Sequence, residues 1–143
     1  MTPLVRLHVL FAILLAALTL ATAGCEDAAT ATSPTPTSPV TETFSGQLVP
    51  GGSAARAFTA ASSGTASITL AQIGPPADLV VGLGIGIPQP NGSGCYLTQT
   101  VQTGASSSPQ ITVPVDAGTY CLRLHDPGTL AAQAAFSVTI VRP

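Results

Sequence analysis

The chain contains no lysine and no tryptophan, and it carries few charges of either sign. Charged residues make up 7% of its 143 positions, whereas an ordinary soluble domain has about 25%. Its four arginines are scattered among six acidic residues, so there is no basic cluster to contact a nucleic-acid backbone. So low a charge also excludes a chain that stays disordered through self-repulsion. Nucleic-acid binding is therefore not expected.

Apolar residues are abundant instead, and the first concentration lies at the N-terminus. A short region carrying Arg6 precedes an apolar run from Val9 to Ala21. This run is shorter than the roughly 20 residues that a membrane-spanning helix requires. Its length and basic flank are typical of a secretory signal peptide.

Two cleavage sites compete after this run. Cleavage after Ala23 by ordinary signal peptidase would release a freely secreted protein. The tetrapeptide ending at Cys25 resembles a bacterial lipobox, with threonine in place of the usual leucine. We favour the lipobox, because lipidation would consume the odd one of three cysteines. Residues 1–24 are then a lipoprotein signal peptide, Cys25 is anchored in the membrane by acyl chains such as palmitate, and Glu26 favours the outer membrane in a Gram-negative source.

Residues 25–43 are rich in Pro, Thr and Ser and show no hydrophobic periodicity. Such a segment cannot bury enough surface to offset the entropy of ordering it. Prolines at positions 34, 36 and 39 favour an extended polyproline conformation. We expect a disordered tether that holds the following domain away from the membrane.

Residues 44–143 alternate apolar with Ser, Thr and Ala side chains in short segments separated by turn residues. This pattern predicts a single antiparallel β-sandwich, all-β and jelly-roll-like. The strands are expected at about 43–49, 54–60, 65–72, 78–87, 94–102, 110–115, 118–125 and 134–142. Tyr120 is expected to form a hydrogen bond across a corner of the sandwich.

The strand near residues 78–87 carries glycine at 82, 84 and 86 on one face. Such a row is either a binding face or a face covered by neighbouring segments, and we favour the second. Cys95 and Cys121 are expected to form a disulfide, which is the default for two cysteines in an exported domain.

Several stretches of residues 41–142 resemble the bacterial pre-peptidase C-terminal (PPC) domain. They are Phe44 to Ser53, Gly64 to Leu70, Pro75 to Leu79 and Ala117 to Tyr120, with Asp126 and Gly128 following. The resemblance implies a β-sandwich that occurs beside secreted peptidases or alone in exported proteins, including short cysteine-containing lipoproteins. In that pattern Asp78 precedes a second acid that helps to bind calcium in related modules, and Val80 occupies that position here.

Catalytic patterns are missing from the mature chain. His125 and Asp126 are adjacent on a strand and point to opposite faces, so they are not expected to act as a base–acid pair. We expect His125 to be solvated at a strand end. The acids lie at turns and are too few for a metal site, so neither a metal nor another cofactor is expected.

The sequence therefore predicts a non-enzymatic, lipid-anchored cell-envelope protein, whose sandwich is a structural or interaction module for a protein or glycan partner. The alternatives are a calcium- or glycan-binding module and the freely secreted form. A ligand would be bound by loop residues Asp78, Tyr96 and Asp126.

Overall fold

The computed structural model describes residues 38–92 and 94–143, and these form eight β-strands. The predicted signal peptide, Cys25 and most of the predicted tether lie outside the described residues. The part of the chain that is described has no helix long and apolar enough to cross a membrane. The strands are β1 (Val40–Leu48), β2 (Ser53–Ala60), β3 (Gly64–Gly74), β4 (Val81–Pro88), β5 (Cys95–Thr103), β6 (Ile111–Val115), β7 (Gly118–His125) and β8 (Ala134–Arg142).

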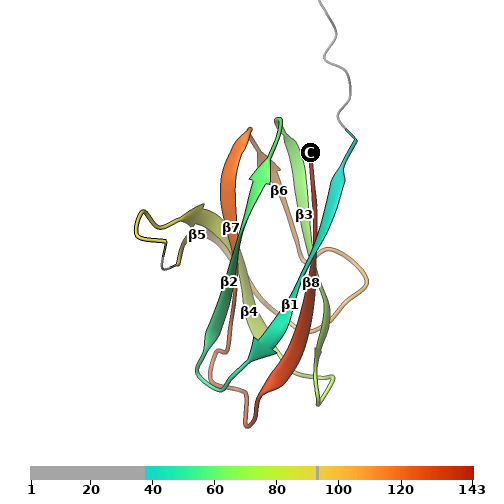
Figure 1. The fold of residues 1–143 in the computed structure, drawn as a ribbon. Helices are drawn as coiled ribbons and strands as arrows, with labels where there is room; N and C mark the ends of the chain where they lie inside the picture. The colour runs from blue at the N-terminus through green and yellow to red at the C-terminus, as the bar shows by residue number, and fades with distance from the viewer. Residues whose placement is uncertain (1–37, 93) are drawn as a thin grey trace, which may run out of the picture. The chain divides into compact units, whose positions relative to one another are not determined.

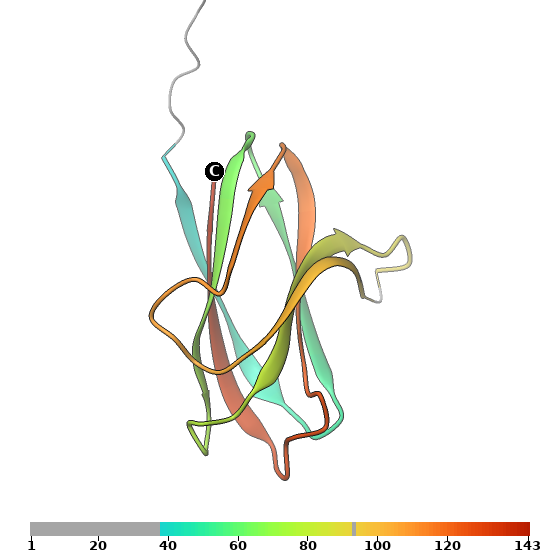
Figure 2. The same ribbon diagram turned by 180° about the vertical axis from the view of Figure 1, so that it is seen from behind.

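The strands form two antiparallel four-stranded sheets that pack face to face (Figures 1 and 2). The strand order is β1-β8-β3-β6 in one sheet and β2-β7-β4-β5 in the other. Sequential strands therefore alternate between the sheets for most of the chain, which is the connectivity of a jelly roll. The predicted fold class is confirmed, and each of the eight expected strands is present.

The core lies between the sheets and follows the two-residue period of the strands. Ile68 and Leu70 of β3 are fully buried, while Ser67 and Thr69, which alternate with them, are only partly covered. From the opposite sheet, Leu83 of β4 and Leu124 of β7 are register partners and are also fully buried. Because the outward-facing positions carry Ser and Thr, the outer surface of the sandwich is hydrophilic although it has few charged residues.

The first strand begins earlier than the sequence indicated. The sequence places residues 40–43 in the tether, but they pair with β8, beginning with Val40 opposite Arg142. Glu42 therefore belongs to the sandwich, where its carboxylate lies 3.3 Å from Arg142 Nη2 and 3.6 Å from Arg56 Nε. These ion pairs join β1 and β8 of one sheet to β2 of the other. Because two arginines neutralise its carboxylate, Glu42 can be a charged residue within the sandwich.

The predicted hydrogen bond of Tyr120 is present. Its hydroxyl accepts from the Asp116 backbone N–H at 3.0 Å and donates to the Asp116 carbonyl at 3.2 Å. The ring also stacks on Phe58 of β2, with centroids 5.8 Å apart. One side chain thus fixes the tight β6–β7 turn to the neighbouring strand.

Candidate functional site

The most distinctive local structure is the β4–β5 hairpin, which is held to β7 by a disulfide. Cys95 begins β5 and Cys121 lies in β7, and β4 runs between these two strands in the sheet order. The sulfur atoms are bonded and the two Cα atoms are 5.9 Å apart. The predicted Cys95–Cys121 disulfide is therefore confirmed.

This disulfide joins strands that are not neighbours, and Gly86 makes the connection possible. Adjacent strands lie about 4.8 Å apart, so strands on either side of a third lie at nearly twice that distance. The start of β5 instead folds over β4, so that the Tyr96 carbonyl occupies the space where a Cβ on Gly86 would stand. A bulge at Thr98, which the register skips, allows this bend. Glycine at 86 therefore brings Cys95 within reach of Cys121.

The other two glycines of β4 are covered as well. The His125 imidazole lies where a side chain on Gly82 would be, and the methyl groups of Leu97 and Thr100 lie 3.0 Å from the position of a Cβ on Gly84. All three glycines are buried. The glycine row is thus a covered face, the alternative that we favoured.

His125 is only partly as the sequence predicts. The residue is partly exposed, but its ring packs on Gly82 and its Nδ1 is buried without a hydrogen-bond partner. The physical reason is the missing side chain at Gly82, which leaves a space of ring size on the sheet. One ring nitrogen of His125 is thus turned into the protein, and the ring covers the sheet at Gly82.

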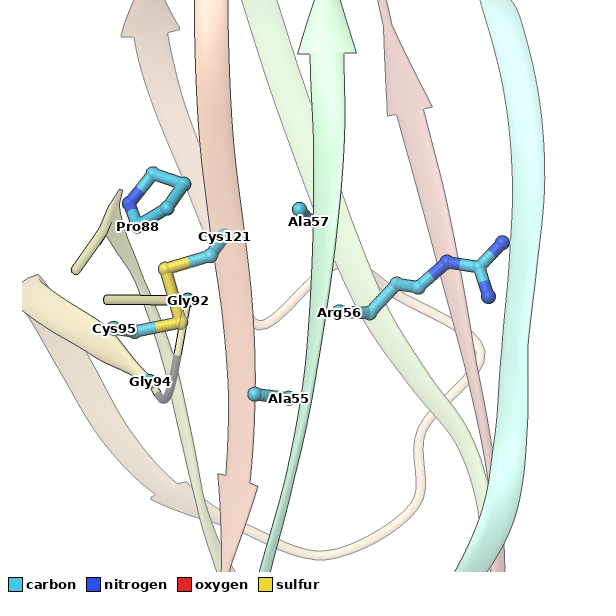
Figure 3. Close-up of a pocket in the computed structure, with 8 residues that line it drawn as sticks. All are labelled: Ala55, Arg56, Ala57, Pro88, Gly92, Gly94, Cys95 and Cys121. Atoms are coloured by element: carbon cyan, nitrogen blue, oxygen red, sulfur yellow. A yellow bond between two sulfur atoms is a disulfide. The ribbon is translucent and has the colours of Figure 1, made fainter. Parts of the chain in front are cut away.

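A pocket of about 210 Å³ lies on the outer side of β2 and β7, beneath the β4–β5 hairpin (Figure 3). Its walls are small side chains, backbone and the disulfide, and Arg56 turns its guanidinium away from them towards β1, where it meets Glu42 (Figure 3). None of the described residues that line the pocket therefore points an acid or a base into it. The lining residues are Ala55, Arg56, Ala57, Pro88, Gly92, Gly94, Cys95 and Cys121.

Asp126 is buried, and its carboxylate holds two loops together. Oδ2 accepts the backbone N–H of Gly51, in the β1–β2 turn, at 2.7 Å. Oδ1 accepts the N–H groups of Gly128, Thr129 and Leu130 at 2.8 to 3.2 Å. The hydrogen bond from Gly51 and those from its own loop outweigh desolvation and lower the pKa of Asp126 to about 2. Both oxygens are thus engaged by the protein's own backbone.

The structure does not bring the three predicted ligand-binding residues into one site. Asp78 is exposed in the β3–β4 loop, which the Thr129 hydroxyl joins to the β7–β8 loop through the Val80 carbonyl at 2.8 Å. Tyr96 pairs with Ile87 at the far end of β4 and is 57% exposed. At about 3.3 Å per residue, the length of β4 separates Tyr96 from Asp78 by roughly 20 Å. Residues 38–92 and 94–143 contain no group of three potential metal ligands from His, Cys, Asp and Glu.

The sequence did not reveal the role of Gln110. Its side chain accepts the Leu70 N–H at 2.8 Å and donates to the Gly104 carbonyl at 3.2 Å. It thereby satisfies the backbone of β3 beside an irregularity between Leu70 and Gln72. Side-chain repair of this kind leaves no periodic signal in the sequence, whereas the glycines at 82, 84 and 86 recur at every second position.

Comparison with known proteins adds little. No family model matches the sequence, so the resemblance to the PPC domain stays a prediction. No curated protein matches it either. Among solved structures, it is similar to Aeromonas hydrophila PliG, a periplasmic lysozyme inhibitor of g-type lysozyme. The TM-score is 0.43 at 12% identity, over 71% of this chain and 86% of that one, which carries no argument about function.

Proposed function

We propose that the chain is a non-enzymatic, lipid-anchored protein of the cell envelope whose jelly-roll domain is a structural or interaction module. The observation that carries the proposal is the disulfide between Cys95 and Cys121. Disulfides persist in oxidising compartments outside the cytoplasm. The bond therefore agrees with export through the predicted signal peptide.

The chemistry of the described residues supports a role without catalysis. His125 packs on Gly82, and Asp126 accepts hydrogen bonds from five donors of its own chain. Glu42 is shared by two arginines, and Asp116 accepts the Ser63 hydroxyl at 3.1 Å. General acid–base catalysis needs such a group within reach of a substrate, and these groups serve the fold instead.

The anchor is tested at Cys25. Expression in a bacterial host with labelled palmitate should label the wild-type chain, and Cys25→Ala should abolish the label and release the protein from membranes. Two acyl chains give stable anchoring at about 0.8 kcal/mol per buried methylene. An unmodified mature chain that begins at Gly24 would contradict the anchor and establish the freely secreted alternative.

The interaction role is tested against the ligand-binding alternative by thermal unfolding with calcium and with a panel of polysaccharides. We expect no ligand to raise the unfolding temperature, because Asp126 is already saturated and Asp78 lies roughly 20 Å from Tyr96. A ligand that binds only the folded state raises the unfolding free energy by about 2.7 kcal/mol at a hundred times its Kd. A rise that Asp78→Ala removes, and that Asp116→Ala leaves intact, would make the domain a ligand-binding module.

A further inference from the structure

Arg123 of β7 is the arginine whose charge no acid neutralises among the described residues. Arg56 and Arg142 both form ion pairs with Glu42. The contact of Arg123 is a hydrogen bond from its Nη2 to the Ser53 hydroxyl at 3.4 Å. A guanidinium keeps its charge in proteins and offers several N–H donors in a planar fork. Most donors of Arg123 therefore have no partner in the described part of the chain.

The sheet face that carries Arg123 holds no acid among the described residues. Side chains alternate along β7, so Arg123 lies on the same outer face of the β2-β7-β4-β5 sheet as Cys121. Glu42 belongs to the other sheet, and the remaining described acids lie in the loops, at Asp78, Asp116 and Asp126. No described acid on this face therefore competes with an external anion for the guanidinium.

Arg123 also stands beside the pocket under the β4–β5 hairpin. Its register partner on β2 is Ala55, and Cys121 precedes it by two positions on β7. Both of these residues line the pocket and are labelled in Figure 3. Register partners on antiparallel strands lie about 5 Å apart, and two positions along a strand span about 7 Å. The long side chain of Arg123 can therefore reach a group bound at the margin of the pocket.

The walls of the pocket determine what can fill it. The methyl groups of Ala55 and Ala57, the ring of Pro88 and the disulfide are apolar, while backbone supplies the polar part of the lining. The volume of about 210 Å³ is below the roughly 300 to 1,000 Å³ of pockets that enclose a drug-sized molecule. The pocket therefore fits a small apolar side chain together with its peptide group.

We propose that this site binds the C-terminal end of a partner protein. The small apolar side chain of the last residue enters the pocket, and its α-carboxylate binds the guanidinium of Arg123. A carboxylate can accept two parallel hydrogen bonds from an arginine. Only the last residue of a chain carries a carboxylate and a separate apolar side chain on the same carbon atom. An internal acid has its carboxylate in place of that side chain, and an acidic polysaccharide would set hydroxyl groups against the alanine methyls.

This inference deepens the proposed interaction role of the domain and rests on it, but it does not depend on lipid anchoring. Few atoms of the partner are covered, and the pocket is open to solvent on one side. We therefore expect a dissociation constant of about 0.1 to 1 mM for a short peptide. Residues 25–143 with Cys25→Ser are suitable for the measurement, because lipid then contributes nothing to binding.

The test is isothermal titration calorimetry with N-acetyl-alanyl-alanine and with its C-terminal amide. The acid should bind about ten times more tightly than the amide, since the amide has no charge to offer Arg123. R123Q should weaken binding of the acid about tenfold and leave that of the amide unchanged, so that the two peptides become equivalent. Thermal unfolding of R123Q should match that of the wild type and show that the variant is folded.

The pocket is tested separately from the arginine. A57L places a larger side chain in the pocket and should abolish binding of both peptides. A132L makes the same exchange at an exposed position of the β7–β8 loop and should leave binding unchanged.

Three results would overturn the proposal. The first is no binding of the acid up to about 10 mM. The second is equal binding of acid and amide by the wild type. The third is equal binding of N-acetyl-alanyl-aspartyl-alanine amide, which would make the ligand any acidic peptide instead of a chain end. Each result removes the site but leaves the interaction role standing, because calcium and polysaccharides test that role separately.

Discussion

Replacing Gly86 by alanine tests how the hairpin is joined to the sheet. A Cβ at this position would overlap the Tyr96 carbonyl oxygen and approach the Leu97 Cα at 2.8 Å. These are backbone atoms, and Tyr96 is held by its pairing with Ile87. The clash can therefore be relieved only by moving the start of β5 away from β4. That movement also draws Cys95 away from Cys121.

We expect G86A to lower the free energy of unfolding by about 3 kcal/mol, which is the upper end of the usual range for an overpacked core. At about 2.1 cal/mol/K per residue, this lowers the unfolding temperature of the domain by roughly 13 °C. Thermal unfolding followed by circular dichroism measures this shift. Alkylation of unreduced, denatured protein should also show a larger fraction of free thiol in G86A than in the wild type.

Two other glycines of the same sheet serve as matched controls, and we expect their replacement by alanine to cost less stability. In G84A the nearest atoms are methyl groups of Leu97 and Thr100 at 3.0 Å and the Gln99 carbonyl oxygen at 3.1 Å. These contacts are tight but do not overlap as in G86A, so we expect a smaller loss of about 1 kcal/mol. In G118A the nearest atom is 4.0 Å away, and we expect a change within about 0.5 kcal/mol. If G86A were as stable as G118A, with its disulfide fully formed, the explanation of the hairpin would be refuted.

Three other predictions concern the disulfide, the buried acid and the turn tyrosine. The double substitution C95A/C121A should lower the unfolding free energy in urea by about 3.5 kcal/mol, through loss of the loop constraint. The pKa of Asp126 lies at about 2 instead of 3.8, so its contribution to stability is complete above pH 4 and lost as the pH falls towards 2; acid titration of D126N should lack this loss. Y120F removes both hydrogen bonds to Asp116 and should cost about 1 kcal/mol in the same urea assay.

The strands could be predicted from the sequence because polar and apolar residues alternate along them with a period of two. Ser67 and Thr69 alternate with Ile68 and Leu70, and this alternation decides both the strand and its buried face. The disulfide could also be predicted, because it follows from the number of cysteines and the expected compartment. Strand ends were less certain: residues 40–43 carry too few apolar side chains to show that they pair with β8.

The surroundings of individual side chains could not be predicted in the same way. His125 was expected in solvent because its neighbours in sequence form a turn, but Gly82, 43 positions earlier, provides the surface that it covers. The sequence predicts Asp126 as a ligand-binding residue, but its carboxylate accepts a hydrogen bond from the backbone N–H of Gly51, 75 positions earlier in the chain. Such contacts depend on which strands become neighbours, and a local pattern of residues does not record this.

The pairing of β1 with β8 has a consequence for how the chain reaches its folded form. Glu42 of β1 and Arg142 of β8 are 100 positions apart in the chain. Within the sheet, β8 lies between β1 and β3 and pairs with both of them. Contacts between distant positions make folding slow, because the intervening chain must first be closed into a loop. The β1-β8-β3-β6 sheet therefore cannot form until β8 is available to pair with both β1 and β3. An event that delays β8, such as its passage through a narrow channel, would keep this whole sheet open.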